Sequence, residues 1–407
     1  MNLWANALSD TGRVRAQNED RFFCDPELGV FAVADGIGGK PGGQVASQTV
    51  IDGINDRAAD FRRFVDARFP DNSADRRDEI FDYLFEELQS INYDVFQRGT
   101  SNKYPRGIGC TVDMVVLAQG GAFILHVGDS RVYLLRDDNI FRVTRDHTYA
   151  ERLLESPDIN QQRLDPEKYK NVLTRSIGKT PRVKVDRLFL DMEPGQRLLL
   201  CSDGITKYFS DPQILAEARS SQDSDLPRRL IEGANERGGA DNSTVVLVAV
   251  QPGAGGAFDR APTQRDTFGQ ARFLQSLELF SELELQEMLK VLRYVRSLNC
   301  QAGEPVIDPA DPVEGLYFVI QGKVEVRLGQ VALGMLGPGE HFGEISLFGD
   351  EAKRPDARCI DDAEILLMPR ESLYRLVRED PVLGNKLLWR LLARTSSVIQ
   401  ELLGRLG

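Results

Sequence analysis

Six acidic residues of this chain stand beside short apolar segments, most of them directly at a segment end: Glu19, Asp20, Asp35, Asp129, Asp203 and Asp241. Carboxylates gathered at the ends of buried strands repel one another and are costly to bury unless a cation holds them together. Oxygen ligands without clustered histidine or cysteine favour Mg²⁺ or Mn²⁺ over zinc, and the whole chain has only 3 histidines. The pattern therefore indicates a magnesium or manganese site.

The stretch VFAVADGIGGK, residues 30–40, also allows another interpretation, a glycine loop that cradles a nucleotide phosphate. A Walker loop needs G-x-x-x-x-G-K-[ST], and a dinucleotide loop needs G-x-G-x-x-G at the start of a helix. The stretch matches neither pattern, and Pro41 interrupts the expected helix start. An Asp-Gly turn after a strand is by itself usually only a turn. The recurrence of aspartates at other strand ends favours a carboxylate presented to a metal.

The segments that must position these carboxylates predict a mixed α and β domain. Over the first 250 residues, short apolar or alternating runs end in Gly, Asp or Asn, which is typical of strands and turns. Residues 41–63 and about 75–97 carry apolar side chains at helical spacing. Residues 150–172 are polar and without a clear period, so we expect a surface excursion there.

Size and composition predict a two-domain protein of the cytoplasm. With 407 residues and 45.5 kDa the chain is long for one core. A formal charge of −12 argues against DNA or RNA as a main partner. We find no apolar run long enough to cross a membrane and no secretory signal at the start. The 5 cysteines are scattered without a CxxC pair, as expected for reduced core cysteines.

A change of composition near residue 251 predicts the domain boundary. The stretch QPGAGGAFDRAPTQRD is rich in Gly, Pro and polar residues and suits a linker. We therefore expect a first domain over 1–250, a linker over 251–269 and a second domain over 270–407, built as helix, β-rich middle and closing helices.

Five short motifs of the first domain together resemble the metal-dependent PPM (type 2C) Ser/Thr protein phosphatases, over about residues 5–250. They are R-x-x-N-E-D from Arg15, D-G-x-G-G from Asp35, G-D-S-R from Gly128, S-D-G from Ser202, and D-N from Asp241. The resemblance implies an α+β fold in which two antiparallel sheets form a sandwich flanked by helices. It also implies a binuclear metal centre at one end and hydrolysis of phosphoserine and phosphothreonine in proteins by a metal-activated water.

The resemblance also implies a role for each matching residue. Asp35 would bridge two Mn²⁺ or Mg²⁺ ions, and the carbonyl of Gly36 would bind one of them. Asp203 and Asp241 would complete the shell of the other ion. Two further acidic residues, Glu19 and Asp20, would act mainly through bound waters.

The phosphate-binding residue implied by the resemblance is Arg15, whose guanidinium would pair with phosphate oxygens. Asn242 either orients its neighbour Asp241 or is an ordinary turn residue before a strand.

Two positions depart from what many family members carry. Ile37 stands where animal members often have a histidine proposed as a general acid, so we expect a bacterial-type enzyme that protonates the leaving group by another route. Lys207 stands where many members have an acidic residue associated with a third metal. Asp129 could still contribute to a third metal or be a turn aspartate that bonds Ser130 or Arg131.

The second domain contains an order of motifs, GEPVI, LYFVIQG and GPGEHFGE, that resembles the cyclic-nucleotide-binding domain family. That resemblance implies a small β-roll with flanking helices and a ligand site that includes Gly343 and Glu344. The arginine that pairs with the nucleotide phosphate would be replaced by Lys353 or, with one inserted residue, by Arg354. Pro355, which has no N–H donor, departs from the family pattern at the same place.

The sequence thus favours a protein phosphatase whose C-terminal domain has a regulatory role and binds a cyclic nucleotide, another small ligand or nothing. A non-catalytic scaffold for phosphoproteins and a small-ligand sensor remain as alternatives. The family often forms dimers through its last helix, and this chain could do the same or pack that helix on its own domain. No helix-turn-helix follows the β-roll in this sequence, so we expect no binding to DNA.

Overall fold

The computed structural model describes residues 2–37, 42–69, 73–100, 104, 107–136, 138–155, 169, 171–252, 267–307, 315–329, 331–344, 347 and 355–406. The chain divides into two compact units, Met1–Thr263 and Gln264–Gly407. Each unit is described by itself below. Most of the expected linker, 253–266, lies outside the described residues. No described helix is long and apolar enough to cross a membrane.

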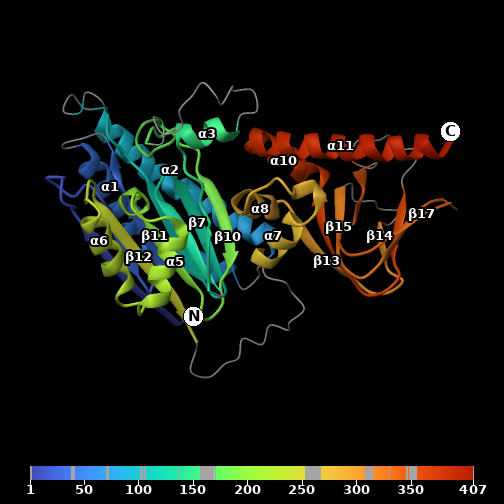
Figure 1. The fold of residues 1–407 in the computed structure, drawn as a ribbon, viewed down its shortest axis with the longest axis horizontal. Helices are drawn as coiled ribbons and strands as arrows, with labels where there is room; N and C mark the ends of the chain where they lie inside the picture. Colours follow the sequence, from blue (N-terminus) through green and yellow to red (C-terminus); the bar gives the residue numbers. More distant parts are fainter. Residues whose placement is uncertain are drawn as a thin grey trace. The chain divides into compact units, whose positions relative to one another are not determined.

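The first unit is built on two five-stranded antiparallel sheets (Figure 1). One has the strand order β1-β12-β11-β8-β9 and the other has the order β10-β7-β6-β3-β2, while the short strands β4 and β5 pair beside them. The bounds are β1 Asn2–Asp10, β2 Arg21–Asp25, β3 Val30–Ala34, β4 Gly36–Ile37, β5 Gly109–Cys110, β6 Val112–Ala118, β7 Gly121–Val127, β8 Arg131–Arg136, β9 Asn139–Arg142, β10 Asp186–Asp191, β11 Arg197–Cys201 and β12 Ser243–Gln251.

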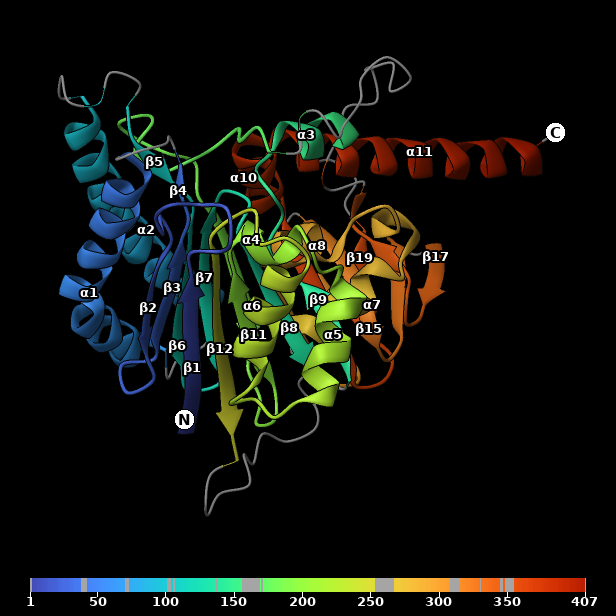
Figure 2. The same cartoon turned by 60° about the vertical axis from the view of Figure 1, so that its left-hand side comes forward.

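Helices cover both outer faces of this pair of sheets, so the unit has the expected α/β/β/α layers (Figure 2). α1 and α2 pack on the sheet that contains β3, whereas α4, α5 and α6 pack on the sheet that contains β12. The bounds are α1 Gly42–Arg68, α2 Ala74–Gly99, α3 Tyr149–Glu155, α4 Asp203–Thr206, α5 Asp211–Ser220 and α6 Leu226–Glu236.

The central strands are apolar on both faces because each sheet is covered twice. Val30, Ala32 and Ala34 of β3 belong to the core under α1 and α2, while Phe31 and Val33, which alternate with them, are also fully buried. Side chains at alternate positions of a strand point to opposite faces, so the second set faces the other sheet. This double burial explains why VFAVA and STVVLVAV read as continuous apolar runs rather than as alternating ones.

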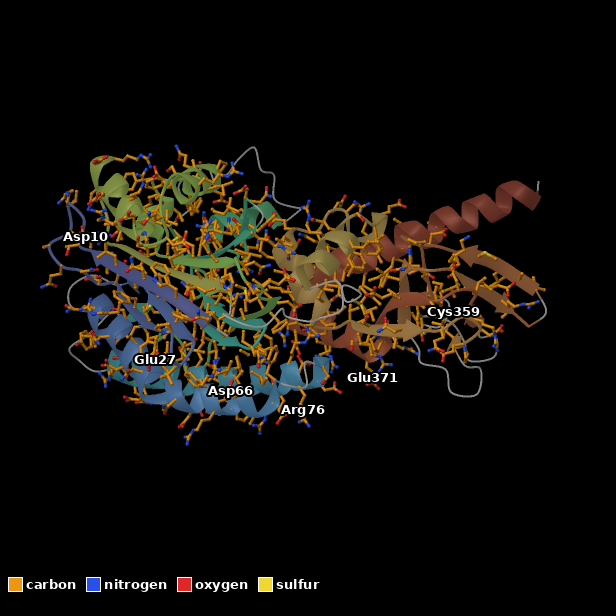
Figure 3. All side chains as sticks on the ribbon, turned by 90° about the horizontal axis from the view of Figure 1, so that it is seen from below. Asp10, Glu27, Asp66, Arg76, Cys359 and Glu371 are labelled. Carbon is orange, nitrogen blue, oxygen red and sulfur yellow. The ribbon has the colours of Figure 1, made fainter. Side chains whose placement is uncertain are left out.

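The two long helices, α1 and α2, are joined by ion pairs on their surface. Arg57 of α1 contacts Glu87 of α2 at 2.9 Å, and Arg68 of α1 contacts Glu79 of α2 at 2.6 Å. Figure 3 labels Asp66 of α1 and Arg76 of α2 on this side of the unit. The helices expected over 41–63 and about 75–97 are confirmed as α1 and α2, and both extend beyond the C-terminal end of the expected range.

The second unit is a β-roll of two four-stranded antiparallel sheets with flanking helices, as expected. The strand orders are β13-β20-β15-β18 and β14-β19-β16-β17. The bounds are α7 Thr267–Gln275, η3 Glu278–Phe280, α8 Leu285–Leu292, β13 Arg296–Cys300, β14 Pro305–Ile307, β15 Gly315–Gln321, β16 Val324–Leu328, β17 Val331–Leu336, β18 His341–Phe342, β19 Asp356–Cys359, β20 Ala363–Pro369, α10 Arg370–Glu379 and α11 Pro381–Leu406.

The last helix, α11, has one face buried in its own unit and another exposed. Leu383, Leu387 and Leu391 are almost fully buried, at the i, i+4 spacing that places them on one face. Trp389 and Leu392 are exposed at 73% and 62%. The helix therefore packs on its own domain and still presents apolar side chains to solvent.

Candidate metal centre

Asp35 directly follows β3 and is fixed through its backbone by Thr111, which lies between β5 and β6. Its N–H donates to the hydroxyl of Thr111 at 3.0 Å, and its carbonyl accepts from the N–H of Thr111 at 2.8 Å. The same hydroxyl pairs with that of Ser130 at 2.7 Å. Gly128, with a φ of +121°, packs so closely on Thr111 that a Cβ would lie 2.5 Å from its methyl carbon. The backbone around Asp35 is therefore held independently of its carboxylate.

Gly36 and Gly43 allow β4 to meet the start of α1 at very short range. A Cβ on Gly36 would lie 2.5 Å from the carbonyl oxygen of Gly43, and a Cβ on Gly43 would lie 2.7 Å from the backbone carbonyl carbon of Gly36 and 2.4 Å from Oε2 of Glu19. Real Cβ atoms do not approach so closely, so both positions require glycine for space. The glycines of the Asp-Gly segment thus bring Glu19, β4 and α1 together.

Asp20 is a buried carboxylate that is only half satisfied by the protein. Its Oδ2 accepts from the hydroxyls of Ser202 and Thr244 at 2.7 and 2.8 Å, and its Oδ1 is buried without a hydrogen-bond partner. Burial raises the pKa of Asp20 to about 6, and the charges of Asp203 and Asp241 act in the same direction. A buried carboxylate oxygen without a hydrogen-bond donor suits the coordination of a cation.

Asp203 is the first residue of α4 and lies within reach of Asp241 at the start of β12. The ammonium of Lys207 joins the two, at 2.8 Å from Oδ2 of Asp203 and 2.5 Å from Oδ2 of Asp241. Oδ1 of Asp203 is buried and without a hydrogen-bond partner. Burial acts to raise the pKa of Asp241, but Lys207 and Arg15 outweigh it and the pKa is lowered.

Arg15 lies at the rim of this group, with half of its side chain exposed. Its Nη2 contacts both carboxylate oxygens of Asp241, at 2.9 and 3.0 Å. Burial acts to lower the pKa of Arg15, but Asp241 and the carboxylates of Glu19 and Asp35 outweigh it and raise the pKa.

Asn242 connects the Arg15 segment to β12 and does not orient Asp241 with its side chain. Its Oδ1 accepts from the N–H of Glu19, and its Nδ2 donates to the carbonyls of Thr11 and Gln17. Only its backbone N–H reaches Asp241, at 3.0 Å from Oδ1. Asn242 therefore fixes the loop that delivers Arg15, Glu19 and Asp20.

The electrostatics show that the predicted aspartates form one group, which we call the acidic cluster: Asp20, Asp35, Asp129, Asp203 and Asp241. Burial raises the pKa of Asp35 well above its ordinary value, and the charges of the other four raise it further. Burial also raises the pKa of Asp129 to about 7, with Asp203 adding to the effect. The two residues expected to bond Asp129 have other partners, because Ser130 pairs with Thr111 and Arg131 with Asp146.

The acidic cluster fits hard divalent cations by its chemistry. Its donors are carboxylate oxygens, which Mg²⁺ and Mn²⁺ prefer, and two buried oxygens, Oδ1 of Asp20 and Oδ1 of Asp203, have no hydrogen-bond donor. Among the described residues, no three acidic, histidine or cysteine side chains stand close enough together to hold an ion without moving. Lys207 stands between two of the carboxylates instead.

A second buried polar network lies behind Asp129. His126 contacts Asp113 at 2.7 Å, and both side chains are fully buried. The ring of His147 lies 4.6 Å from that of His126, and its Nδ1 accepts from the N–H of Gly128 at 3.1 Å. Burial lowers the pKa of His147 to about 3, so the ring is neutral and able to accept this hydrogen bond.

In the second unit, only part of the expected ligand site falls on described residues. Gly343 has a φ of +108°, and a Cβ there would lie 2.1 Å from the carbonyl oxygen of Gly315, so the turn requires glycine. Oε1 of Glu344 lies 3.0 Å from Nε2 of His341. Lys353 and Arg354 lie outside the described residues.

The sequence identified the acidic residues but missed their hydroxyl partners. Thr111 fixes Asp35, while Ser202 and Thr244 fix Asp20, and a lone Ser or Thr in or beside a strand carries no signal of its own. The one available hint was position, since Ser202 and Thr244 lie next to the S-D-G and D-N motifs.

Comparison with family models assigns the two units to different families. The protein phosphatase 2C model matches residues 13–226, which is more than half of the chain. The cyclic nucleotide-binding domain model matches residues 297–380.

Known relatives match the first unit. The serine/threonine phosphatase stp of Listeria innocua is 32% identical over 253 residues, covering 60% of this chain and 95% of that protein. The crystal structure of the Mycobacterium tuberculosis serine/threonine phosphatase PstP/Ppp is 29% identical with a TM-score of 0.51, and the match covers 61% of this chain and 99% of that one. The catalytic domain of PstP in complex with 2 manganese ions is 30% identical with a TM-score of 0.51, covering 61% of this chain and 99% of that one.

Proposed function

Since the chain belongs to the protein phosphatase 2C family, we propose that it hydrolyses phosphoserine and phosphothreonine in proteins with two divalent cations, Mn²⁺ or Mg²⁺, bound at the acidic cluster. The observation that carries the proposal is the convergence of four aspartate charges on Asp35, with buried oxygens of Asp20 and Asp203 left without donors. The manganese complex of the PstP catalytic domain supports the choice of ions.

The proposed ligands are those that the family resemblance implies. Asp35 would contact both cations, with the carbonyl of Gly36 binding one of them, while Asp203 and Asp241 would complete the shell of the other. Glu19 and Asp20 would act through waters, and Asp129 would border the site. When bound, two cations sharing a water lower its pKa and direct it at phosphorus, so no covalent phosphoenzyme is needed.

Arg15 would orient the substrate and offset charge in the transition state. Its contact with Asp241 uses Nη2, and the guanidinium carries further N–H donors that can pair with two phosphate oxygens. Its half-exposed position at the rim suits a group that meets substrate from solvent. Ile37 carries no proton to give, so the leaving serine or threonine oxygen would take its proton from another source.

The test is hydrolysis of a phosphothreonine peptide by the full chain with Mn²⁺ and with EDTA. We expect turnover that depends on Mn²⁺ and is lost in Asp35→Asn. Asp25→Asn is the matched control, because Asp25 also ends a strand but accepts hydrogen bonds from the N–H groups of Glu27 and Leu28 in a turn. Turnover in EDTA, or turnover retained in Asp35→Asn, would contradict the proposed site.

For the second unit we propose a regulatory role in which a cyclic nucleotide or another small ligand binds near Glu344. The family match over 297–380 and the glycine turn at Gly343 support this site. Calorimetry with cAMP and cGMP should show binding that weakens in Glu344→Gln, and turnover should change when the ligand is present. If neither nucleotide binds and turnover does not change, the proposed regulatory role is contradicted.

We also propose a dimer contact and a cytoplasmic location. Trp389 and Leu392 give α11 an exposed apolar face through which two chains could dimerise. All 5 cysteines are free thiols, which suits action in the reducing cytoplasm.

A further inference from the structure

Lys207 occupies an unusual position for a lysine in a site proposed to bind cations. It follows α4 directly, one helical turn after Asp203, and its ammonium contacts Oδ2 of Asp203 at 2.8 Å and Oδ2 of Asp241 at 2.5 Å. Both partners are proposed ligands. Most of the lysine side chain is covered, with 28% exposed. Its charge is therefore placed inside the acidic cluster rather than in solvent.

We propose that Lys207 is a tethered cation that stabilises the metal-free acidic cluster and lowers its affinity for divalent ions. This inference rests on the proposed function, because it concerns the affinity of that metal site. It adds a residue that sets how readily the enzyme gains and loses its metals.

The stabilising half of the proposal follows from charge. Five carboxylates lie close enough to act on one another, and among the described residues Arg15 and Lys207 are the cations that form ion pairs with them. Arg15 contacts Asp241 alone, whereas Lys207 contacts both Asp203 and Asp241. Without the ammonium, two neighbouring carboxylates would face each other with no cation between them, which destabilises the folded chain.

The weakening of metal affinity follows from the same contacts. A divalent ion bound to Asp203 and Asp241 would lie within a few ångström of the ammonium, and like charges repel strongly at that range in a partly buried site. Oδ1 of Asp203 is buried and has no donor, so one oxygen can bind metal while Lys207 holds the other. Lys207 thereby also orients the carboxylate, and we expect the repulsion between the +1 and +2 charges to outweigh this gain.

The surroundings hold the ammonium at the acidic cluster. Lys207 also lines a pocket of about 520 Å³ together with Arg131, Arg142 and Asp211. The two arginines repel the ammonium, and Asp211 already lies 3.9 Å from Nη1 of Arg131 and accepts from the hydroxyl of Tyr133 at 2.9 Å. The pocket therefore offers Lys207 no better partner than Asp203 and Asp241.

The test compares Lys207→Met with the natural chain by two measurements other than activity. Calorimetric titration of the metal-free full chain with Mn²⁺ should show at least tenfold tighter binding in Lys207→Met, because the repelling charge is gone. Thermal unfolding in EDTA should show a lower midpoint for Lys207→Met, and saturating Mn²⁺ should raise its midpoint more than that of the natural chain. Lys207→Arg, which keeps the charge, should bind Mn²⁺ about as weakly as the natural chain.

Arg57→Met is the matched control. The side chain of Arg57 has nearly the same exposure as that of Lys207, and the substitution removes an ion pair with Glu87, which is not a member of the acidic cluster. It should lower the midpoint slightly and leave Mn²⁺ affinity unchanged. Unchanged or weaker Mn²⁺ binding in Lys207→Met, or an unchanged midpoint in EDTA, would overturn the inference. A failure of the proposed function would give a different result. The natural chain would then bind no Mn²⁺, or Asp35→Asn would bind Mn²⁺ as tightly as the natural chain does.

Discussion

His147 makes the first unit sensitive to acid through a group that is not a proposed metal ligand. Burial lowers the pKa of its ring to about 3, whereas an unfolded chain has a histidine pKa of about 6.5. Between these two values the unfolded chain binds more protons than the folded one, so the free energy of unfolding falls as the pH falls. From a folded pKa of about 3, the loss between pH 7 and pH 5 is roughly 2 kcal/mol.

The assay compares the natural chain with His147→Asn in urea at pH 7 and pH 5, both in EDTA. Asparagine keeps an oxygen that can accept from the N–H of Gly128, where Nδ1 of His147 accepts at 3.1 Å, but it does not titrate. The chain has 2 tryptophans, Trp4 in the first unit and Trp389 in the second, so a Trp389→Phe background makes fluorescence report the first unit alone.

Because the acidic cluster is the same in both proteins, its own titration cancels in the difference between them. We expect His147→Asn to gain about 2 kcal/mol relative to the natural chain between pH 7 and pH 5. A difference that is equal at the two pH values would refute the reasoning, since it would mean that His147 does not stay neutral in the folded chain.

Three further substitutions test single contacts of the site. Thr111→Val should lower the free energy of unfolding by about 1–3 kcal/mol, measured in urea, because the N–H of Asp35 loses its acceptor. Thr49→Val should cost less, because the hydroxyl it removes donates within α1 and accepts only from the side chain of Arg98, so no backbone N–H loses an acceptor. Gly204→Ala should cost about 3 kcal/mol in the same assay, because its Cβ would lie 1.8 Å from the carbonyl oxygen of Asn242; no loss would contradict this packing. Arg15→Lys should raise KM for a phosphopeptide by about tenfold at unchanged Mn²⁺ stoichiometry, because the guanidinium fork is lost; an unchanged KM would exclude Arg15 from phosphate binding.

Local patterns of the sequence predicted the strands and helices, whereas the layers in which they pack were implied by the family resemblance. Apolar runs that end in Gly, Asp or Asn identify strands, and the helical spacing over 75–97 identifies α2, whichever partners these elements meet. The acidic residues were also recognisable, since Asp35, Asp203 and Asp241 stand beside the same kind of apolar run.

The remaining features of the site depend on pairings that no local pattern encodes. The bond between Asp20 and Thr244 joins residues 224 positions apart, and it connects the residue before β2 with β12 of the other sheet. The contact of Lys207 with Asp241 likewise requires the approach of α4 to the start of β12. A sequence shows that Lys207 replaces an acidic residue, but only the structure shows which carboxylates it joins.

The pairing of β1 with β12 has a consequence for how the protein is made. Asn2 lies opposite Gln251, and Asp10 lies opposite Ser243. The first strand of the unit therefore pairs with a strand that is synthesised last. At about 5–20 residues per second, a ribosome needs more than ten seconds to supply the partner of a strand it has already released. During that interval β1 has no β12 to pair with, and Arg15, Glu19 and Asp20 have no Asp241 to meet. The newborn chain therefore brings Asp241 to Arg15, Glu19 and Asp20 only after the whole first unit has emerged, and we expect no phosphatase activity before that moment.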